Sequence, residues 1–335
     1  MSAGTSAAII GAGSWGTALA IVLAPRFEHI RLWAHETDLV EHMFSTRIND
    51  VFLPGFSLPL NVDPTADLSY ALESAGIVVG VMPSRFARPL YREMLPHLGI
   101  EMRFVSATKG LEQGSLLRMS EVARTVIGQK FEPRVAVLSG PTFAREVARG
   151  EPTAVVIASP DRELAESIQR EFSGPTFRLY ANDDPVGVEL GAALKNIIAI
   201  GAGICDGLGL GSNSMAALIT RGLAEITRLA IALGGRPKTL AGLAGLGDLV
   251  LTCNGALSRN RTVGIELAKG RTLTDIVGSM TMIAEGVETT AAACDLARKC
   301  GVDMPITLQM DAILRGRTSP RAAIRELMER ALKTE

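Results

Sequence analysis

Hydrophobic positions come in short continuous runs through the first half of the chain, and amphipathic stretches separate several of them. The runs occupy residues 7–10, 30–33, 77–82, 103–107, 134–138, 153–158 and 176–180. Helical patterns lie between some of them, for example over residues 115–127 and 161–172. Strands that are apolar on both faces and alternate with helices are typical of a parallel sheet covered on both sides. The pattern therefore predicts a doubly wound, Rossmann-type α/β domain.

The pattern changes after Tyr180, where the strand signals stop. Asn182, Asp183 and Asp184 offer a helix cap before Pro185, and helical periodicity then covers residues 188–204, 214–233, 287–300 and 305–314. A last helix is predicted to begin at Ser319–Pro320. We therefore expect an α/β domain over residues 1–184 and an all-helical domain over residues 185–335. Glycine-rich breaks at 201–211 and 242–247 suit a close approach of backbone to a ligand or a neighbouring helix.

Three glycines lie between the first predicted strand and the helix that follows it. Gly11, Gly13 and Gly16 form a GxGxxG pattern. The first glycine allows a tight turn, the second lets the backbone approach a pyrophosphate, and the third permits close packing of helix on strand. The helix N-terminus then faces the anion. Because a second strand follows within the expected span of about 30 residues, the pattern favours a dinucleotide site over a merely structural turn.

The end of the second predicted strand is where a residue should meet the adenosine ribose. Glu36 would accept a hydrogen bond from a 2′-hydroxyl and favour NAD, whereas a protonated His35 would face a 2′-phosphate and favour NADP. An ordinary solvated loop acid explains Glu36 equally well. The sequence leaves the choice between NAD and NADP open.

Lys195 interrupts a helical segment that is otherwise apolar on nearly every side, residues 188–200. A helix of this kind is usually buried, and lysine is among the residues least often fully buried. A buried ammonium suits proton transfer, because burial without a partner is costly or removes its proton. The alternative is a lysine whose stem follows the helix until its head reaches water.

Composition and charge narrow the classes of function. The chain has 335 residues, 47% hydrophobic and 21% charged, as in a globular protein with a sizeable core. A formal net charge of −1 gives no electrostatic case for nucleic acid or an anionic membrane surface. The four cysteines show no CxxC spacing, which argues against a metal site and for reduced thiols. No basic residue precedes the apolar residues 7–24, and no uncharged apolar run elsewhere approaches a membrane span, so a cytoplasmic location is expected.

Several loops combine cations with small hydrogen-bond donors. Thr108–Lys109–Gly110 follows one predicted strand and residues 139–144 follow the next, at the strand ends where α/β sheets place their ligands. In the helical half, Asp248 lies in a glycine-rich segment and Ser258–Arg261 carries two arginines. Each feature alone is better explained as a surface cation, a helix cap or a solvated pair. Together they supply groups that suit a phosphate, with a carboxylate and a lysine for proton handling.

The chain resembles bacterial NAD(P)-dependent glycerol-3-phosphate dehydrogenase in long segments that follow in order from Ile9 to Pro305. These segments are GAGSWGTALA, SATKGLE, SGPTFAREVA, ELGAALKNIIAIGAGICDGLGLG, NSMAALITRGLAE, AGLGDLVLTC, LSRNR and AEGVETT. The resemblance implies interconversion of sn-glycerol 3-phosphate and dihydroxyacetone phosphate, which would supply glycerol 3-phosphate for phospholipid synthesis. Many members carry an arginine or a second basic residue near Ala34–His35, and this chain has only His35 there.

The resemblance also implies a role for individual residues. Lys195 would be the proton acceptor. Contacts to the cofactor would come from the glycine turn and from Ser14, Trp15, His35, Lys109, Ala144, Arg259, Ile283 and Glu285. Contacts to the substrate would come from Lys109, Gly140, Thr142, Lys195, Asp248, Ser258, Arg259 and Asn260.

The expected mechanism divides the work between cofactor and protein. The nicotinamide carries the hydride, while Lys195 supplies the proton and, as an ammonium, stabilises the developing alkoxide. Asp248 would orient the lysine but would also raise its pKa, so the sequence does not say whether desolvation or this carboxylate dominates. A β-hydroxyacid or 6-phosphogluconate type dehydrogenase is the alternative enzyme, and a non-enzymatic dinucleotide sensor is the alternative outside catalysis. For a glycerol-3-phosphate dehydrogenase a homodimer is one candidate assembly, and the sequence leaves the oligomeric state open.

Overall fold

The chain folds as an α/β unit followed by a helical unit. The computed structural model describes residues 6–280 and 284–332. The α/β unit extends to Lys109 and resumes over Leu117–Glu189. The helical unit comprises Gly110–Leu116 together with the chain from Leu190 onward. The division therefore falls inside one long helix, five residues beyond the end of the α/β domain expected from sequence.

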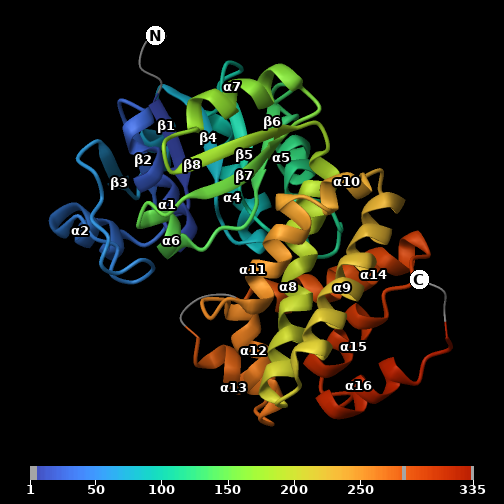
Figure 1. Cartoon of the computed structure of the whole chain (residues 1–335). Coiled ribbons are helices and arrows are strands. Elements are labelled where there is room, and N and C mark those ends of the chain that lie inside the picture. The colour runs from blue at the N-terminus through green and yellow to red at the C-terminus, as the bar shows by residue number, and fades with distance from the viewer. Residues whose placement is uncertain (1–5, 281–283, 333–335) are drawn as a thin grey trace. The chain divides into compact units, whose positions relative to one another are not determined.

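A single eight-stranded sheet forms the centre of the α/β unit, in the order β3-β2-β1-β4-β5-β6-β7-β8 (Figure 1). Its strands are β1 (Ser6–Ile10), β2 (Ile30–Trp33), β3 (Val62–Thr65), β4 (Ala75–Gly80), β5 (Arg103–Ser106), β6 (Arg134–Ser139), β7 (Thr153–Ala158) and β8 (Phe177–Asn182). The strand order reverses direction between β1 and β4, which is the point where doubly wound sheets bind their ligands. The glycine turn follows β1 and so lies at this point.

The prediction of a parallel sheet is right for β1 to β6 and needs correction beyond them. β7 pairs antiparallel with β6, and β8 pairs parallel with β7, so the last two strands run against the first six. The connection from β6 to β7 holds only the short helix α6 (Ala144–Ala148) and returns at the edge where β6 ends. A parallel pairing would need a crossover to the opposite edge of the sheet.

Helices cover both faces of this sheet (Figure 1). Alternate strand residues point to opposite faces, so Ile9 belongs to one buried cluster and Ile10 to the other. The Ile9 cluster includes apolar residues of α1 (Ser14–Leu23), α2 (Thr37–Thr46), α6 and α7 (Arg162–Phe172). The Ile10 cluster includes residues of α3 (Leu68–Leu72), α4 (Ala87–Met94) and α5 (Met119–Ile127). Burial on both faces explains the continuous apolar runs in the sequence.

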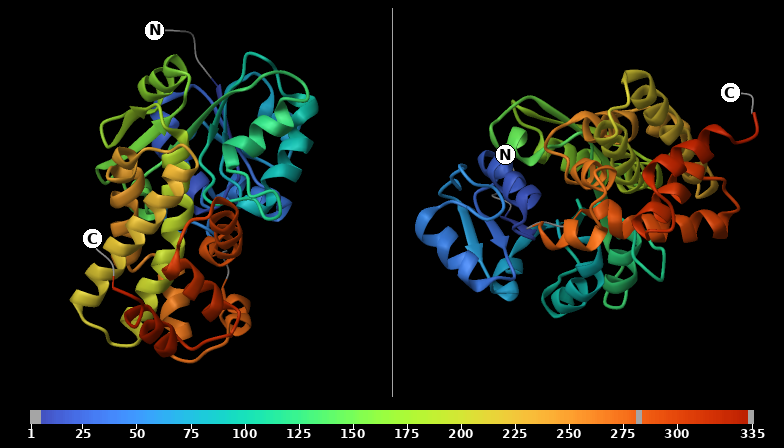
Figure 2. Two further views of the ribbon diagram at one scale, coloured as in Figure 1. Left: turned by 90° about the vertical axis from the view of Figure 1, so that its right-hand side faces the viewer. Right: turned by 90° about the horizontal axis from the view of Figure 1, so that it is seen from below.

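Helix α8 (Pro185–Gly207) supplies the core of the helical unit. Among its described residues this unit contains only helices and connecting segments, and its part from Leu190 onward is drawn from yellow-green to red in Figure 2. The helices after α8 are α9 (Ser212–Ala232), α10 (Pro237–Leu240), α11 (Asp248–Asn254), α12 (Arg259–Ala268), α13 (Leu273–Gly278), α14 (Glu285–Cys300), α15 (Pro305–Leu314) and α16 (Pro320–Met328). By length and composition α8 is apolar enough to cross a membrane, but its whole apolar window is buried inside the structure, as in a core helix.

Several sequence predictions match element boundaries closely. The strand over residues 153–158 and the helix over 305–314 have the predicted limits, and Ser319 caps α16 with Pro320 at its first position. The helix predicted from residue 115 begins only at Met119, because Leu116 is left-handed with φ +62°. Strand β3 was not predicted. It is short, lies at the sheet edge and contains Pro64, which weakens any strand signal.

Candidate active site

The turn after β1 is shaped by two glycines and leaves open space at the third. Gly11 has φ +123°, and a Cβ there would lie 2.7 Å from the carbonyl oxygen of Val81. A Cβ on Gly16 would lie 1.8 Å from the carbonyl oxygen of Gly11. A Cβ on Gly13, in contrast, would meet no described atom within 4 Å. Gly11 and Gly16 therefore serve packing, while Gly13 borders space that a ligand can occupy.

The first turn of α1 has the properties of an anion site. Its N-cap is Gly13, which has no side chain with which to satisfy the first amides of the helix. Ser14 Oγ donates to the carbonyl of Phe52 at 2.6 Å. The buried Nε1 of Trp15 finds no hydrogen-bond acceptor in the described part of the chain. First-turn amides without a side-chain cap at the positive end of a helix, an open glycine and an unsatisfied indole donor together fit the phosphates of a dinucleotide.

Asn49 holds this turn in place, and sequence reasoning missed it. Its side chain is fully buried and its Nδ2 donates to the carbonyl of Ala12 at 2.8 Å and to Oγ1 of Thr17 at 2.9 Å. Its Oδ1 accepts from the amide of Phe52 at 3.0 Å. An asparagine in a loop 37 residues from its partner leaves no local signal in the sequence.

The two candidates for the ribose end both lie at the surface beyond β2. His35 is exposed, and its ring centre lies 6.2 Å from that of Trp33. Glu36 is also exposed and is the N-cap residue of α2 without a side-chain cap bond. Since both side chains reach solvent, the structure is compatible with either a ribose hydroxyl or a ribose phosphate.

Three of the predicted substrate residues come together after β5 and β6. The carbonyl of Gly140 accepts from Nζ of Lys109 at 3.4 Å and from Oγ1 of Thr142 at 3.3 Å. Gly140 has φ +150°, and a Cβ there would lie 3.0 Å from the Cα of Val155, so a glycine is required. Ala144 begins α6 directly afterwards. This cluster gathers an ammonium and a hydroxyl at the ligand-binding edge of the sheet.

Lys195 is buried and paired. Its side chain is 6% exposed, which excludes the alternative of a lysine that reaches water. Its Nζ forms an ion pair with Oδ1 of the fully buried Asp248 and donates to Oγ1 of Thr252 at 2.8 Å. Thr252 Oγ1 in turn donates to the carbonyl of Asp248 at 2.6 Å. Sequence reasoning named Asp248 as the partner but missed Thr252, which lies four residues on and so on the same helix face.

Glycines bring Asp248 to the helix that carries the lysine. A Cβ on Gly191 of α8 would lie 2.5 Å from the carbonyl oxygen of Ala244. Ala244 belongs to the π-helical turn η4 (Leu243–Gly247), and a Cβ on Gly245 in this turn would lie 2.0 Å from the carbonyl oxygen of Leu240. The glycine-rich break at 242–247 therefore serves a close approach to a neighbouring helix. Turns of the π type occur frequently at functional sites.

The start of α12 carries the remaining predicted substrate residues. Ser258 Oγ caps the helix by accepting from the amide of Arg261 at 3.3 Å. The buried Asn260 accepts from the amide of Gly286 at 2.9 Å, at the start of α14. Arg259 keeps part of its side chain exposed, yet crowding around the guanidinium lowers its pKa by desolvation, and Glu285 opposes this shift. It stays charged at neutral pH, as arginines do in proteins. The predicted cofactor contact Ile283 lies outside the described residues.

One buried thiol lies near this pair. Burial raises the pKa of Cys253 to about 12, and the charge of Lys195 opposes the rise. The thiol is therefore neutral at physiological pH and is a poor nucleophile.

Family models match both parts of the chain. Residues 6–165 match the N-terminal region of NAD-dependent glycerol-3-phosphate dehydrogenase, and residues 184–325 match its C-terminal region.

Individual relatives match over nearly the whole length. The chain is 61% identical to a glycerol-3-phosphate dehydrogenase (NAD(P)+) of Koribacter versatilis, with 98% of each chain covered. It is 53% identical to the protein of the same name from Acidobacterium capsulatum, over 98% of this chain and 99% of that one. The crystal structure of glycerol-3-phosphate dehydrogenase from Coxiella burnetii superposes with a TM-score of 0.93 at 43% identity, covering 98% of this chain and 99% of the other.

Proposed function

Because this chain belongs to the NAD-dependent glycerol-3-phosphate dehydrogenase family, we propose that it interconverts sn-glycerol 3-phosphate and dihydroxyacetone phosphate with NAD or NADP. The observation that carries the proposal is the buried Lys195–Asp248 pair, together with a glycine turn that fits a dinucleotide. A protein that only sensed the dinucleotide would have no use for a buried lysine held by two acceptors.

The α/β unit is the proposed dinucleotide-binding part. Its first-turn amides after Gly13 would hold the pyrophosphate, and the Nε1 of Trp15 is a further donor. His35 and Glu36 would lie at the adenosine ribose. The bound nicotinamide supplies or accepts the hydride. Residues 1–184 are thus proposed as the cofactor domain, and residues 185–335 as the substrate and catalytic domain.

Lys195 is the proposed proton carrier. In the direction of ketone reduction its ammonium donates a proton to the carbonyl oxygen, and in the reverse direction its amine takes the proton from the alcohol. Asp248 and Thr252 fix the position of Nζ, so the proton is presented from one direction. A cation near the developing alkoxide also stabilises the charge that forms on the oxygen.

The phosphate of the substrate accounts for the other predicted residues. Arg259 can grip a phosphate through two donors of its planar guanidinium, and Lys109 adds a point charge. Gly140, Thr142, Ser258 and Asn260 would contribute smaller polar contacts. A β-hydroxyacid without a phosphate would need no such set of cations. 6-Phosphogluconate also carries a phosphate, and there the preference for glycerol 3-phosphate rests on the match to the family.

The physiological setting is part of the same proposal. The product glycerol 3-phosphate would feed phospholipid synthesis in the cytoplasm. The sequence leaves the oligomeric state open; a homodimer stays a prediction, and light scattering on the purified protein would test it.

A turnover assay tests the function directly. Purified protein should oxidise NADH or NADPH, followed by nicotinamide absorbance, only when dihydroxyacetone phosphate is present. The ratio of kcat/KM for the two cofactors would decide the preference left open at His35 and Glu36. Parallel assays with 6-phosphogluconate and a 3-hydroxyacid should show much slower turnover. If dihydroxyacetone phosphate supports no turnover with either cofactor, the proposed function is wrong.

A further inference from the structure

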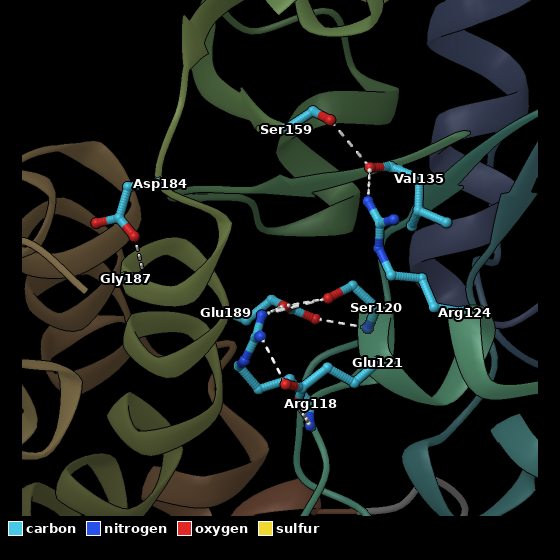
Figure 3. Close-up of polar contacts among 9 residues, drawn as sticks. All are labelled: Arg118, Ser120, Glu121, Arg124, Val135, Ser159, Asp184, Gly187 and Glu189. Atoms are coloured by element: carbon cyan, nitrogen blue, oxygen red, sulfur yellow. Dashed lines mark hydrogen bonds and ion pairs between the residues drawn. The ribbon is translucent and has the colours of Figure 1, made fainter. Parts of the chain in front are cut away.

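A buried carboxylate at the start of α8 has no part in the proposed chemistry. The side chain of Glu189 is 4% exposed, six residues before Lys195 on the same helix. Figure 3 shows the groups that meet it, all of them at the beginning of α5. Its Oε2 accepts from Nη1 of Arg118 and from Oγ of Ser120, both at 2.6 Å, and its Oε1 accepts from the amide of Ser120 at 2.8 Å.

Through these bonds Glu189 links α8 to the start of α5, and we call this link the fastening. Burial raises the pKa of its carboxyl group, while Arg118 and Ser120 act in the opposite direction. A buried carboxylate is tolerated when it is paired and hydrogen-bonded, and the positive end of α5 adds to this. Removal of the charge would leave the Arg118 guanidinium, itself mostly buried, without its buried partner. The contact therefore fixes the first turn of α5 to the second turn of α8.

The segment just before α5 is the one that carries Lys109. Between Lys109 and Arg118 the backbone takes left-handed conformations at Gly110, Gly114 and Leu116, with φ of +137°, +81° and +62°. A left-handed leucine is strained and persists only where the surrounding structure holds it. The bond from the amide of Leu116 to the carbonyl of Glu112, at 3.0 Å, spans only this segment.

The two ends of this segment are held in different ways. At the first end, Oγ1 of Thr108 donates to the carbonyl of Gly80 at 3.3 Å, and Lys109 contacts Gly140 through a long 3.4 Å bond. At the second end, Arg118 and Ser120 make three short, mostly charge-assisted bonds to Glu189. The second end is thus attached through a buried carboxylate, whereas the first end follows β5 directly, with the amide of Ala107 donating to the carbonyl of Gly80 at 2.9 Å. If the second end is released, the segment gains conformational freedom, and ordering it again on ligand binding costs free energy.

We propose that Glu189 is a positioning residue that holds the Lys109 segment, residues 107–117, in the conformation that presents Lys109 to a phosphorylated substrate. The inference rests on the proposed function only in assigning a substrate to Lys109. The fastening itself follows from the contacts of Glu189.

The test compares two conservative variants, Glu189→Gln and Glu225→Gln. Glu225 is a matched control because it is also a buried glutamate whose carboxylate accepts hydrogen bonds from the first turn of a helix. Its carboxylate accepts from the amides of Ile306 at 2.6 Å and Thr307 at 3.1 Å, and from Oγ1 of Thr307 at 3.1 Å. Both variants keep the side-chain shape and remove one buried negative charge. Only Glu189 adjoins the Lys109 segment.

Two readouts separate positioning from general stability. Amide hydrogen exchange of residues 110–117 reports the segment itself and needs no turnover. Steady-state kinetics report Lys109 through the KM for dihydroxyacetone phosphate. We expect Glu189→Gln to speed exchange in the segment and to raise this KM by about tenfold, with kcat within about threefold of the wild type. Glu225→Gln should lower the unfolding midpoint but leave both quantities as in the wild type.

Each other outcome overturns a defined part. If Glu189→Gln folds and leaves both exchange and KM unchanged, or if Glu225→Gln changes them equally, Glu189 has no positioning role. If Glu189→Gln fails to fold, Ser120→Ala replaces it, because this variant removes one hydrogen-bond donor and keeps the ion pair. Ser120→Ala should speed exchange in the segment and raise the KM, both by less than Glu189→Gln would. If neither quantity changes, the proposal is overturned. If the wild type shows no turnover but the exchange result is as expected, the proposed function fails and the fastening stands.

Discussion

The candidate sites of the two units consist of different chemical groups. In the α/β unit the site is mostly backbone: a left-handed glycine, open space at Gly13 and the uncapped amides of α1. In the helical unit it is a set of side chains, with Lys195 and Asp248 paired across 53 residues of sequence. A backbone site depends on what is absent, namely a Cβ. A side-chain site depends on particular charged groups, so the two should fail in different ways when mutated.

The largest expected effect is the loss of Lys195, the proposed proton carrier. Lys195→Ala should lower kcat by about 10³-fold or more, because both proton transfer and alkoxide stabilisation are lost. The affinity for NADH, measured by fluorescence titration, should stay within about threefold, since the glycine turn is untouched. Added primary amines of small size should restore part of the rate. Near-normal turnover without them would contradict the role of Lys195.

A smaller effect is expected when the lysine stays and its partner changes. Asp248→Asn keeps the shape of the side chain but leaves a buried ammonium without its carboxylate. Breaking a buried pair in this way typically costs about 3–5 kcal/mol of unfolding free energy. We expect a lower midpoint in urea and a fall in kcat of about 10- to 100-fold, through poorer placement of Nζ. Unchanged stability would show that Thr252 and other neighbours suffice to hold the ammonium.

The glycine turn offers a matched pair of substitutions within one motif. Gly16→Ala would place a Cβ 1.8 Å from the oxygen of Gly11, so it should destabilise the fold by about 1–3 kcal/mol. Gly13→Ala meets no described atom within 4 Å, so it should leave the thermal midpoint unchanged. It should nevertheless raise the KM for the nicotinamide cofactor about tenfold, because the methyl group enters the space for the pyrophosphate. Equal cofactor KM values for Gly13→Ala and the wild type would remove Gly13 from the site.

The same contrast explains how much of the fold the sequence reveals. Local sequence patterns determine features such as the strand over residues 153–158 and the cap at Ser319, and both appear where predicted. The reversal of β7 is not local, because it depends on which edge of the sheet the connection through α6 reaches. Strand β3 fails for a related reason, since its pairing with β2 outweighs the poor strand propensity around Pro64.

The candidate site divides along the same line. The glycine turn is legible because three glycines at fixed spacing can be read between a strand and a helix. Lys195 can be identified from the sequence because it is a charged residue in an otherwise apolar helix. Asn49 and Thr252 are not, because an asparagine in a loop and a threonine in a helix are ordinary until tertiary structure supplies their partners. The partners of Glu189 also come from a distant segment and leave no signal.

The smallest expected effect concerns the pH dependence of a buried carboxylate outside the site. Burial raises the pKa of Glu225 above its ordinary value of 4.5, and the amides of Ile306 and Thr307 only partly offset this. The folded protein therefore binds this proton more tightly than the unfolded chain does. The resulting stabilisation is complete below pH 4.5 and is lost as the pH rises through the raised pKa.

The Glu225→Gln variant lacks this titration. The wild-type advantage in unfolding free energy over Glu225→Gln should therefore shrink with rising pH, by at most about 1.4 kcal/mol per pH unit. Urea denaturation of both proteins between about pH 5 and about pH 8 measures the difference. An advantage that grows with pH would mean that the amides of α15 outweigh burial. Glu225 would then resemble the backbone site of the α/β unit, where amides at a helix start dominate.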